Sequence, residues 1–291
     1  MTLQELRQKL EQFVDTDEDH VIRPDYAIRP EYAGVPFFDA PLVCCADAED
    51  PLFAQFQADP TIYGPFFRRP QEWLPGAKRV IAVFFPFTKE IRDSNRGKSE
   101  QTSDLWLHAR VEGQAFLMKA CRQIAAWLRA EGYRTLIPAE DEAFGMTRQF
   151  EKMSEGCPGF VSNWSERHAA YAAGLGTFSL SKHLITEKGV CGRFGSIITD
   201  APVEVTPRPY SDPFEYCILC GRCNNNCPVG ALHPEQGAAR GKDLLTCAKY
   251  VDETRVRFAP RYGCGKCQLD VPCETGIPRV ALGLDAKSSE G

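Results

Sequence analysis

The sequence lacks several features that would place it in common protein classes. It has no run of about 18 apolar residues, so we expect no membrane-spanning helix. It has no long block of lysine and arginine, and its formal net charge of −5 argues against a nucleic-acid partner. The first 20 residues have no basic head followed by an apolar stretch, which a secretion signal requires. Together these absences predict a cytoplasmic protein with no membrane partner.

Cysteine, in contrast, is abundant and unevenly distributed. Hydrophobic residues make up 43% of the 291 residues, which is enough for a sizeable core. Thirteen cysteines without a secretion signal favour metal binding in a reducing compartment over disulfides. Five of them lie before residue 200, and eight lie between residues 217 and 273. A metal centre is therefore expected in the last third of the chain.

A proline-rich segment divides the sequence. Residues 202–213 contain four prolines, which predicts an extended linker. We place a domain boundary near residue 209. The predicted fold class is α+β, with a mixed α/β cofactor-binding and substrate domain over residues 1–208. A ferredoxin-like domain is predicted over residues 209–283, followed by a polar tail at 284–291.

The first domain alternates strand-like and helix-like patterns. Its best helix is predicted over residues 103–132, with Ser103 at the start and Gly132 at the end. Cys121 lies on the apolar face of this helix and is expected in the core. The other expected elements are an amphipathic N-terminal helix, buried strands at 40–47 and 78–87, a strand at 134–139, a short helix at 163–174 and a β-hairpin at 183–200 that turns near 188–192.

The first cysteine run has the spacing of bacterial ferredoxins. Cys217, Cys220, Cys223 and Cys227, with Pro228 after them, fit C-x2-C-x2-C-x3-C-P. In this pattern three thiolates bind one [4Fe–4S] cluster, and the fourth binds a neighbouring cluster. The run therefore predicts two clusters, provided that further cysteines complete the ligand sets.

A second cysteine group supplies enough further ligands. Its members are Cys247, Cys264, Cys267 and Cys273. The spacing between its last two members is five residues, in "CGKCQLDVPC", instead of the usual three. The alternative is zinc, held by two C-x2-C pairs, but the run of three cysteines at successive spacings of three favours clusters. The crossover rule assigns one cluster to Cys217, Cys220, Cys223 and Cys273, and the other to Cys227, Cys247, Cys264 and Cys267.

Two adjacent clusters conduct electrons and require an acceptor. A two-cluster ferredoxin module needs only about 60–80 residues, near the lower end of domain sizes. The 208 residues that precede the boundary are therefore expected to hold the acceptor.

The stretch "ERHAAYAAGLGTFSLSKHLITEKGVCGRFGSIITDAPVE" (166–204), followed by the cysteine module, resembles the corrinoid-dependent iron–sulfur reductases. This group includes epoxyqueuosine reductase and the reductive dehalogenases. The shared order is a helix that ends in a Gly-Leu-Gly turn, an apolar strand, a glycine-bearing turn and a strand that ends in Thr-Asp. "YGCGKCQ" (262–268) adds to the likeness, which covers residues 160–275.

The resemblance implies a cobalamin in the first domain, beside a [4Fe–4S] cluster, that reduces a small-molecule substrate. Electrons would come from an external donor of the ferredoxin or flavodoxin type. The residues that it points to for the cofactor are Gly174, Leu175, Gly176, Ser179, Ser181, Lys182, Gly195 and Thr199. Gly174 has a simpler interpretation as the glycine that ends a helix.

The proton donor departs from the family pattern. Epoxyqueuosine reductases carry an acidic donor shortly before the matching helix, whereas "GFVSNWSE" (159–166) contains no aspartate. The nearby candidates are Glu166, His168 and Tyr171. Glu166 is alternatively a helix-capping partner of Asn163.

Two isolated cysteines and the function itself remain open at this point. Cys157 and Cys191 lie in predicted turns, where they either face a cavity or are incidental small residues. Three functions are compatible with the sequence: a corrinoid-dependent reductase of a small molecule, an electron-transfer or activating protein for another metal or corrinoid protein, and an epoxyqueuosine reductase acting on tRNA.

Overall fold

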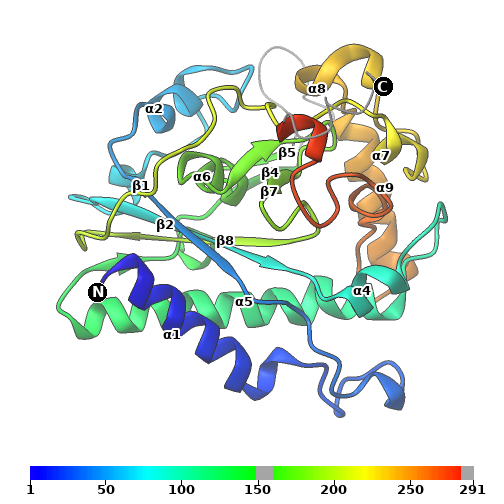
Figure 1. Ribbon diagram of the computed structural model, residues 1–291, viewed down its shortest axis with the longest axis horizontal. Helices are drawn as coiled ribbons and strands as arrows, with labels where there is room; N and C mark the ends of the chain where they lie inside the picture. The colour runs from blue at the N-terminus through cyan, green and yellow to red at the C-terminus, as the bar shows by residue number, and fades with distance from the viewer. Residues whose placement is uncertain (149–159, 283–291) are drawn as a thin grey trace, which may run out of the picture.

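A four-stranded antiparallel sheet forms the centre of the molecule. The computed structural model describes residues 1–148 and 160–282 (Figure 1). The strand order is β1-β2-β8-β3. Strand β2 is almost wholly buried, because helices cover both faces of the sheet. The strands are β1 (Leu42–Asp47), β2 (Arg79–Pro86), β8 (Gly192–Thr199) and β3 (Thr135–Leu136).

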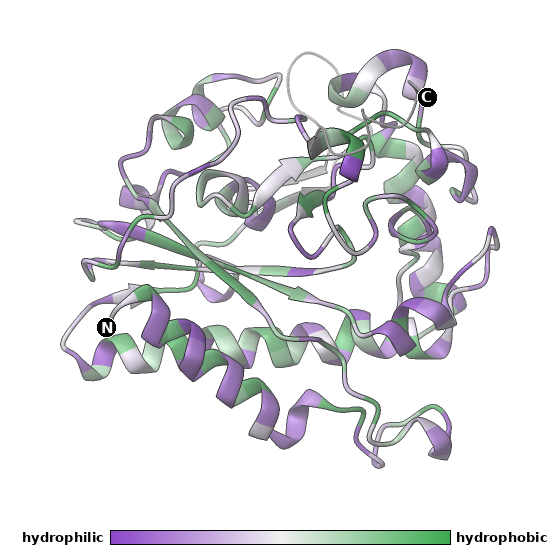
Figure 2. Ribbon diagram, viewed as in Figure 1, coloured by the Kyte–Doolittle hydropathy of each residue, from purple (hydrophilic) through white to green (hydrophobic). Residues whose placement is uncertain are grey.

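Two cores lie on opposite faces of this sheet. Helices α1 (Leu3–Thr16) and α5 (Asp104–Ala130) cover one face, and α2 (Pro51–Ala58) and α6 (Glu166–Ala172) cover the other (Figure 1). Alternate residues of β2 enter the two cores, as the period of two in a strand requires. Figure 2 shows hydrophobic strands at the centre and a hydrophilic outer face on α1.

Most of the predicted elements of the first part are confirmed. Helix α5 begins after Ser103, whose hydroxyl accepts the Trp106 N–H at 3.2 Å. Gly132 follows its end with a φ of +89°, a conformation that favours glycine. Cys121 is fully buried, as predicted. The strand expected at 134–139 is shorter, because a 3-10 turn begins at Pro138.

The hairpin predicted over 183–200 is wrong. Strand β7 (Leu184–Thr186) pairs with β6 (Gly176–Phe178), whereas β8 pairs with β2 and β3. The chain between β7 and β8 makes only a tight turn in which Gly189 bridges Thr186, and then packs against the last cysteine loop, where the Val190 N–H donates to the Cys273 carbonyl at 2.9 Å.

The proline-rich segment carries no helix or strand and is bonded to the first part of the chain. The Thr206 N–H donates to the Cys45 carbonyl at 2.8 Å, and the Thr206 hydroxyl accepts the Cys45 N–H at 3.0 Å. Tyr210 donates its hydroxyl to the Tyr171 carbonyl at 2.7 Å. The segment therefore covers part of the outer edge of β1. The domain boundary near residue 209 remains a prediction.

The remaining elements are short, apart from one helix in the cysteine-rich part. Among the residues described, no helix is both long enough and apolar enough to cross a membrane. The short elements are α3 (Pro70–Trp73), α4 (Lys89–Ser94), β4 (Met146–Arg148), β5 (Phe160–Ser162), α7 (Arg222–Asn225) and α8 (Gly237–Arg240), and the longer helix is α9 (Leu244–Arg257).

Candidate iron–sulfur centre and adjoining polar cluster

The first predicted ligand set lines one hollow. Leu219 and Gly221 have positive φ values of 50° and 71°, which turn the first cysteine loop tightly. The β6–β7 hairpin contributes Ser179, Leu180 and Ser181 to the same walls. The loop with five residues between its cysteines reaches the hollow, because Cys273 lines it. The cysteines around it are Cys217, Cys220, Cys223, Cys267 and Cys273.

The second predicted set is also gathered together. Burial, together with the neighbouring Cys247 and Cys227, raises the pKa of the Cys264 thiol to about 11. Burial likewise raises the pKa of Cys267, with a contribution from Cys264. Such mutual effects require short separations between the thiols. Iron binding must release protons from these thiols, so cluster assembly is expected to depend on pH.

Backbone donors are aimed at two of the sulfurs. Leu180 N–H donates to Cys217 Sγ at 3.3 Å, and Ala231 N–H donates to Cys227 Sγ at 3.3 Å. Such bonds are among the factors that set the potential of an iron–sulfur cluster.

A four-thiolate zinc site would hold its sulfurs about 4 Å apart, given zinc–sulfur bonds of about 2.3 Å. Within 1–148 and 160–282, no three Cys, His, Asp or Glu side chains are arranged to share one metal ion.

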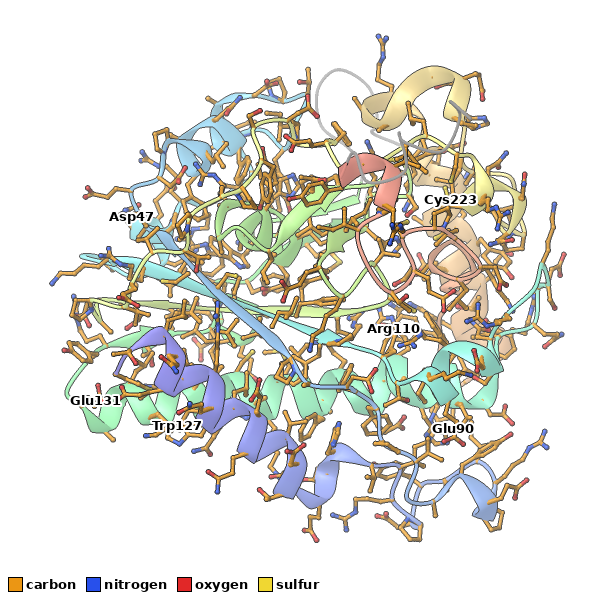
Figure 3. All side chains as sticks on the ribbon, viewed as in Figure 1. Asp47, Glu90, Arg110, Trp127, Glu131 and Cys223 are labelled. Carbon is orange, nitrogen blue, oxygen red and sulfur yellow. The ribbon has the colours of Figure 1, made fainter. Side chains whose placement is uncertain are left out.

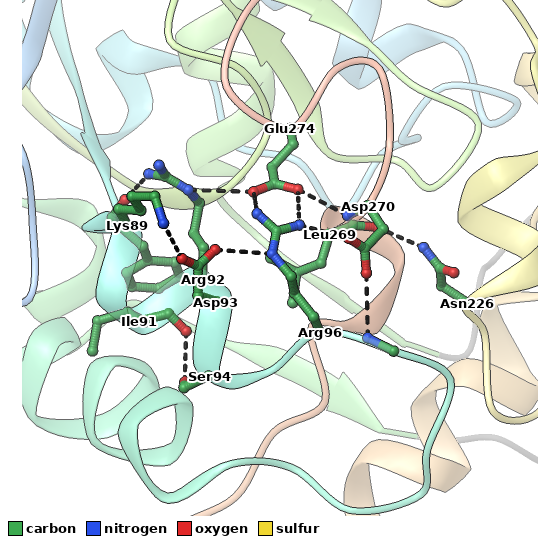
Figure 4. Close-up of polar contacts among 12 residues, drawn as sticks. Lys89, Ile91, Arg92, Asp93, Ser94, Arg96, Asn226, Leu269, Asp270 and Glu274 are labelled. Atoms are coloured by element: carbon green, nitrogen blue, oxygen red, sulfur yellow. Dashed lines mark hydrogen bonds and ion pairs between the residues drawn. The ribbon is translucent and has the colours of Figure 1, made fainter.

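An ion-pair network holds the last cysteine loop in place (Figure 4). Glu274, beside Cys273, is nearly buried and receives two bonds from Arg96, at 2.7 and 2.8 Å. It also accepts the Asp270 N–H at 2.8 Å and pairs with Arg92 at 3.4 Å. The network thus ties helix α4 and the residues after it to a predicted cluster ligand.

Of the three proton-donor candidates, Glu166 has the pKa closest to neutrality. Burial raises the pKa of its carboxyl to about 7, against hydrogen bonds from Ser196 and Trp164 that lower it. Its Oε2 atom is buried without a hydrogen-bond partner among the described residues. Ser165, not Asn163, caps α6 through the His168 N–H, so the predicted capping pair is wrong.

The other two candidates have other surroundings. His168 packs against aromatic rings, and burial lowers its pKa to about 3, so it is neutral at pH 7. Its Nδ1 lies 2.8 Å from the Ser165 hydroxyl. Tyr171 stacks on Tyr210 at 5.3 Å, and burial raises its pKa. Neither is poised to release a proton near neutral pH.

Most of the predicted cofactor residues lie on or next to the β6–β7 hairpin. Their polar groups are largely engaged: Ser179 bonds Ser181 at 2.9 Å, and Lys182 Nζ donates to the Ala239 carbonyl at 2.7 Å. A Cβ at Gly176 would lie 1.9 Å from the Ile185 carbonyl, so this glycine is needed for strand pairing. Gly174 and Leu175 form the turn between α6 and β6.

Gly195 and Thr199 lie apart from the other predicted cofactor residues. A Cβ at Gly195 would lie 2.7 Å from the side chains of Cys121 and Leu117, so this glycine faces α5. The Thr199 hydroxyl donates to the Arg134 carbonyl at 2.8 Å. Cys191 is buried in the core on that face, whereas Cys157 lies outside the described residues.

Sequence reasoning missed the basic residues beside the second cysteine group. Arg167 NH1 donates to the Lys182 carbonyl at 2.6 Å, and its charge acts on Cys247 and Cys267. His183 Nδ1 lies 4.0 Å from Cys267 Sγ. Arg193 is the one charged residue of strand β8 (GRFGSIIT), and this feature is visible in the sequence. We call Glu166, Arg167, His183 and Arg193 the polar cluster.

Comparisons with known proteins agree with this arrangement. A 4Fe–4S binding domain family matches residues 213–233. An epoxyqueuosine reductase of Bacillus cereus is 26% identical over 220 residues, which cover 72% of this chain. The chain spans about half (51%) of that relative's length.

Two solved structures share the fold. A crystal structure of epoxyqueuosine reductase with an epoxyqueuosine-modified tRNA stem loop has a TM-score of 0.51 at 17% identity, covering 96% of this chain and 70% of that one. A reductive dehalogenase, whose structure suggests a mechanism for B12-dependent dehalogenation, has a TM-score of 0.53 at 17% identity, covering 84% and 32%.

These findings confirm the resemblance to the epoxyqueuosine reductases and reductive dehalogenases, the mixed α/β fold and 4Fe–4S binding. They give no support to the expectation that nucleic acid is excluded as a partner, because one structural neighbour is bound to a tRNA stem loop.

Proposed function

We propose that the protein is a corrinoid-dependent iron–sulfur reductase. In this proposal two [4Fe–4S] clusters pass electrons to a cobalamin, which reduces a small molecule. The observation that carries it is the position of the polar cluster, whose members Arg167 and His183 adjoin the second cysteine group. A buried carboxyl with a pKa of about 7 lies in the same cluster.

Electrons would enter at the first cysteine loop. Cys220 is exposed there, and Leu219 retains 43% of its surface accessible. An external donor of the ferredoxin or flavodoxin type would contact this surface. The ligand set that includes Cys273 would pass electrons to the set that includes Cys267, beside the polar cluster.

The residues of the polar cluster fit a bound corrinoid better than the hairpin hydroxyls do. Arg167 is exposed, so it can donate to an amide or phosphate, whereas the hydroxyls of Ser179 and Ser181 bond each other. When bound, cobalamin supplies a strongly reducing centre. Glu166, protonated near neutral pH, can then release a proton from Oε2 to the substrate.

Corrinoid binding tests this proposal. Anaerobically reconstituted protein should contain about eight iron and eight sulfide per chain, about four per cubane. Titration with cob(II)alamin should change the cobalt EPR signal, because binding would replace the aqueous surroundings of the cobalt by protein groups. Arg167→Gln should weaken binding at unchanged iron content, whereas Arg29→Gln, an exposed residue paired with Asp104, should not. No binding at high micromolar cobalamin would leave electron transfer to another protein as the function.

A second candidate is epoxyqueuosine reduction in tRNA, which the Bacillus cereus relative and the tRNA-bound structural neighbour favour. A gel-shift assay with an epoxyqueuosine-modified stem loop separates it from reduction of a small molecule. Specific binding of the modified over the unmodified stem loop would select the tRNA substrate.

A further inference from the structure

Two arginines and a tyrosine meet where the sheet, α5 and the second cysteine loop come together. Arg110 NH2 donates to the Tyr262 hydroxyl at 3.0 Å, and its guanidinium lies 4.5 Å from the centre of that ring. Arg193 Nε donates to Gln114 Oε1 at 2.8 Å. Gln114 follows Arg110 by one helical turn, so both face the same side of α5. Figure 3 shows Arg110 at the end of α5 that approaches the cysteine-rich part.

Within the part of the chain that the structure describes, neither arginine has an acidic partner at hydrogen-bonding distance. Among the described residues, Arg110 and Arg193 form no ion pair, and their hydrogen bonds go to a neutral phenol and a neutral amide. Arg255, on the other side of Tyr262 at 3.6 Å, is paired with Asp252 at 3.1 Å. A charge that is removed from water without a counter-charge is costly, so two such groups side by side call for an anion.

The electrostatics of Arg193 and Glu166 agree with an anion-binding role. Burial lowers the pKa of Arg193, and the neighbouring Arg110 lowers it further. Glu166 is the acid that acts on Arg193, and its own pKa of about 7 leaves it only partly charged at neutral pH.

We propose that Arg110, Arg193 and the Tyr262 hydroxyl bind the carboxylate or phosphate group of the substrate. All three side chains are only partly buried, so a ligand can reach them. An arginine pair offers the planar donors that such oxyanions prefer. The charges of Arg193 and Glu166 also act on each other, although the Arg193 side chain bonds α5 and Glu166 begins α6. The identification of the bound group as part of the substrate rests on the proposed function, whereas the anion site itself does not.

Anion binding to the complete, cluster-loaded protein tests the site without cobalamin. The probes are inorganic phosphate and benzoate, with benzamide as the uncharged match for benzoate. We expect both anions, but not benzamide, to raise the melting temperature of the wild type. Arg193→Gln and Arg110→Gln should weaken anion binding by about 10-fold or more, as loss of a charged hydrogen bond implies. Arg122→Gln, on the exposed side of α5, should not.

Stability without anion distinguishes a binding role from a structural one. If Arg193 serves a ligand, Arg193→Gln should melt at or above the wild-type temperature in anion-free buffer, because an unpaired charge is removed. A clear fall in that temperature, with unchanged anion binding, would overturn the proposal. Equal stabilisation by benzoate and benzamide would overturn it as well.

Corrinoids separate the two sources of the anion. Cobinamide lacks the nucleotide phosphate of cobalamin. If Arg193→Gln weakens binding of cobalamin but not of cobinamide, the site holds the cofactor's phosphate and the substrate assignment is overturned. Equal binding of both by the variant supports the substrate. Failure of every corrinoid to bind would refute the proposed function and leave the anion result standing.

Discussion

At the scale of single residues, Glu166 is the group whose environment differs most from that of an ordinary surface carboxyl. It begins a short helix, where an acid normally complements the helix dipole. Its Oε2 atom is nonetheless buried and unpartnered among the described residues. Such a carboxyl is stable in its protonated form and is disfavoured when ionised.

Replacement of Glu166 should therefore change how stability depends on pH. The folded-state pKa of about 7 lies above the ordinary value of 4.5, so the stability that the protonated group provides is lost as pH rises from about 4.5 through 7. Glu166→Gln removes this loss, and its unfolding free energy relative to wild type should rise by up to about 3 kcal/mol between pH 5 and pH 8. Denaturant unfolding at both pH values measures it.

The exposed Glu11→Gln substitution on α1 is the control and should leave the pH dependence unchanged. Parallel stability curves for wild type and Glu166→Gln would show that the carboxyl is already ionised at pH 5, and that it is no proton reservoir.

At the scale of elements, the last cysteine loop depends on a distant helix for its position. The Glu274 carboxylate accepts hydrogen bonds from Arg96 and forms an ion pair with Arg92. Arg92 lies in α4, and Arg96 lies just after it. The β6–β7 hairpin contacts the first cysteine loop, where the Leu180 N–H donates to Cys217 Sγ. The predicted cluster ligands are thus fixed by elements far away in the sequence.

Loss of this anchor should release iron from one cluster before the other. In Glu274→Gln both arginines lose the carboxylate that ties them to the loop carrying Cys273, although Arg92 keeps Asp39 and Arg96 keeps Asp93 and Asp270, so this loop loosens. Incubation with an iron chelator should remove about four of about eight iron atoms faster than in wild type. Lys89→Gln is the matched control, because Lys89 is 81% exposed and its ion pair with Asp93 lies within α4. An unchanged, single-phase release from the Glu274 variant would contradict the anchoring role.

The sequence predicts long or strongly patterned elements well, and tertiary pairings poorly. Local hydrophobic patterns predict helix α5 and strands β1 and β2. The spacing of the cysteines predicts the iron–sulfur motif in the same local way. The pairing of β7 with β6 rather than β8 depends on the loop around Cys273, more than 80 residues away. The arginines of the polar cluster and of the anion site come from separate elements, so only the fold brings them together.

At the scale of the whole molecule, the proline-rich segment joins the two parts without being a free linker. Thr206 bonds both backbone groups of Cys45 on β1, which is an outer strand of the sheet. Unpaired strand edges promote association between chains. We therefore expect a fragment of residues 1–200 to self-associate, and one of residues 1–213 to remain monomeric, by size-exclusion chromatography. Equal behaviour of the two would show that the edge needs no cover.

This edge cover also constrains the order of synthesis. β1 and β2 leave the ribosome early, but the residues that shield β1 follow more than 150 positions later. At about 5–20 residues per second, the edge of the sheet is left open for roughly 10–30 seconds. A growing chain must stay apart from its neighbours during that interval, so slow translation or crowded polysomes are the conditions under which this protein would misassemble.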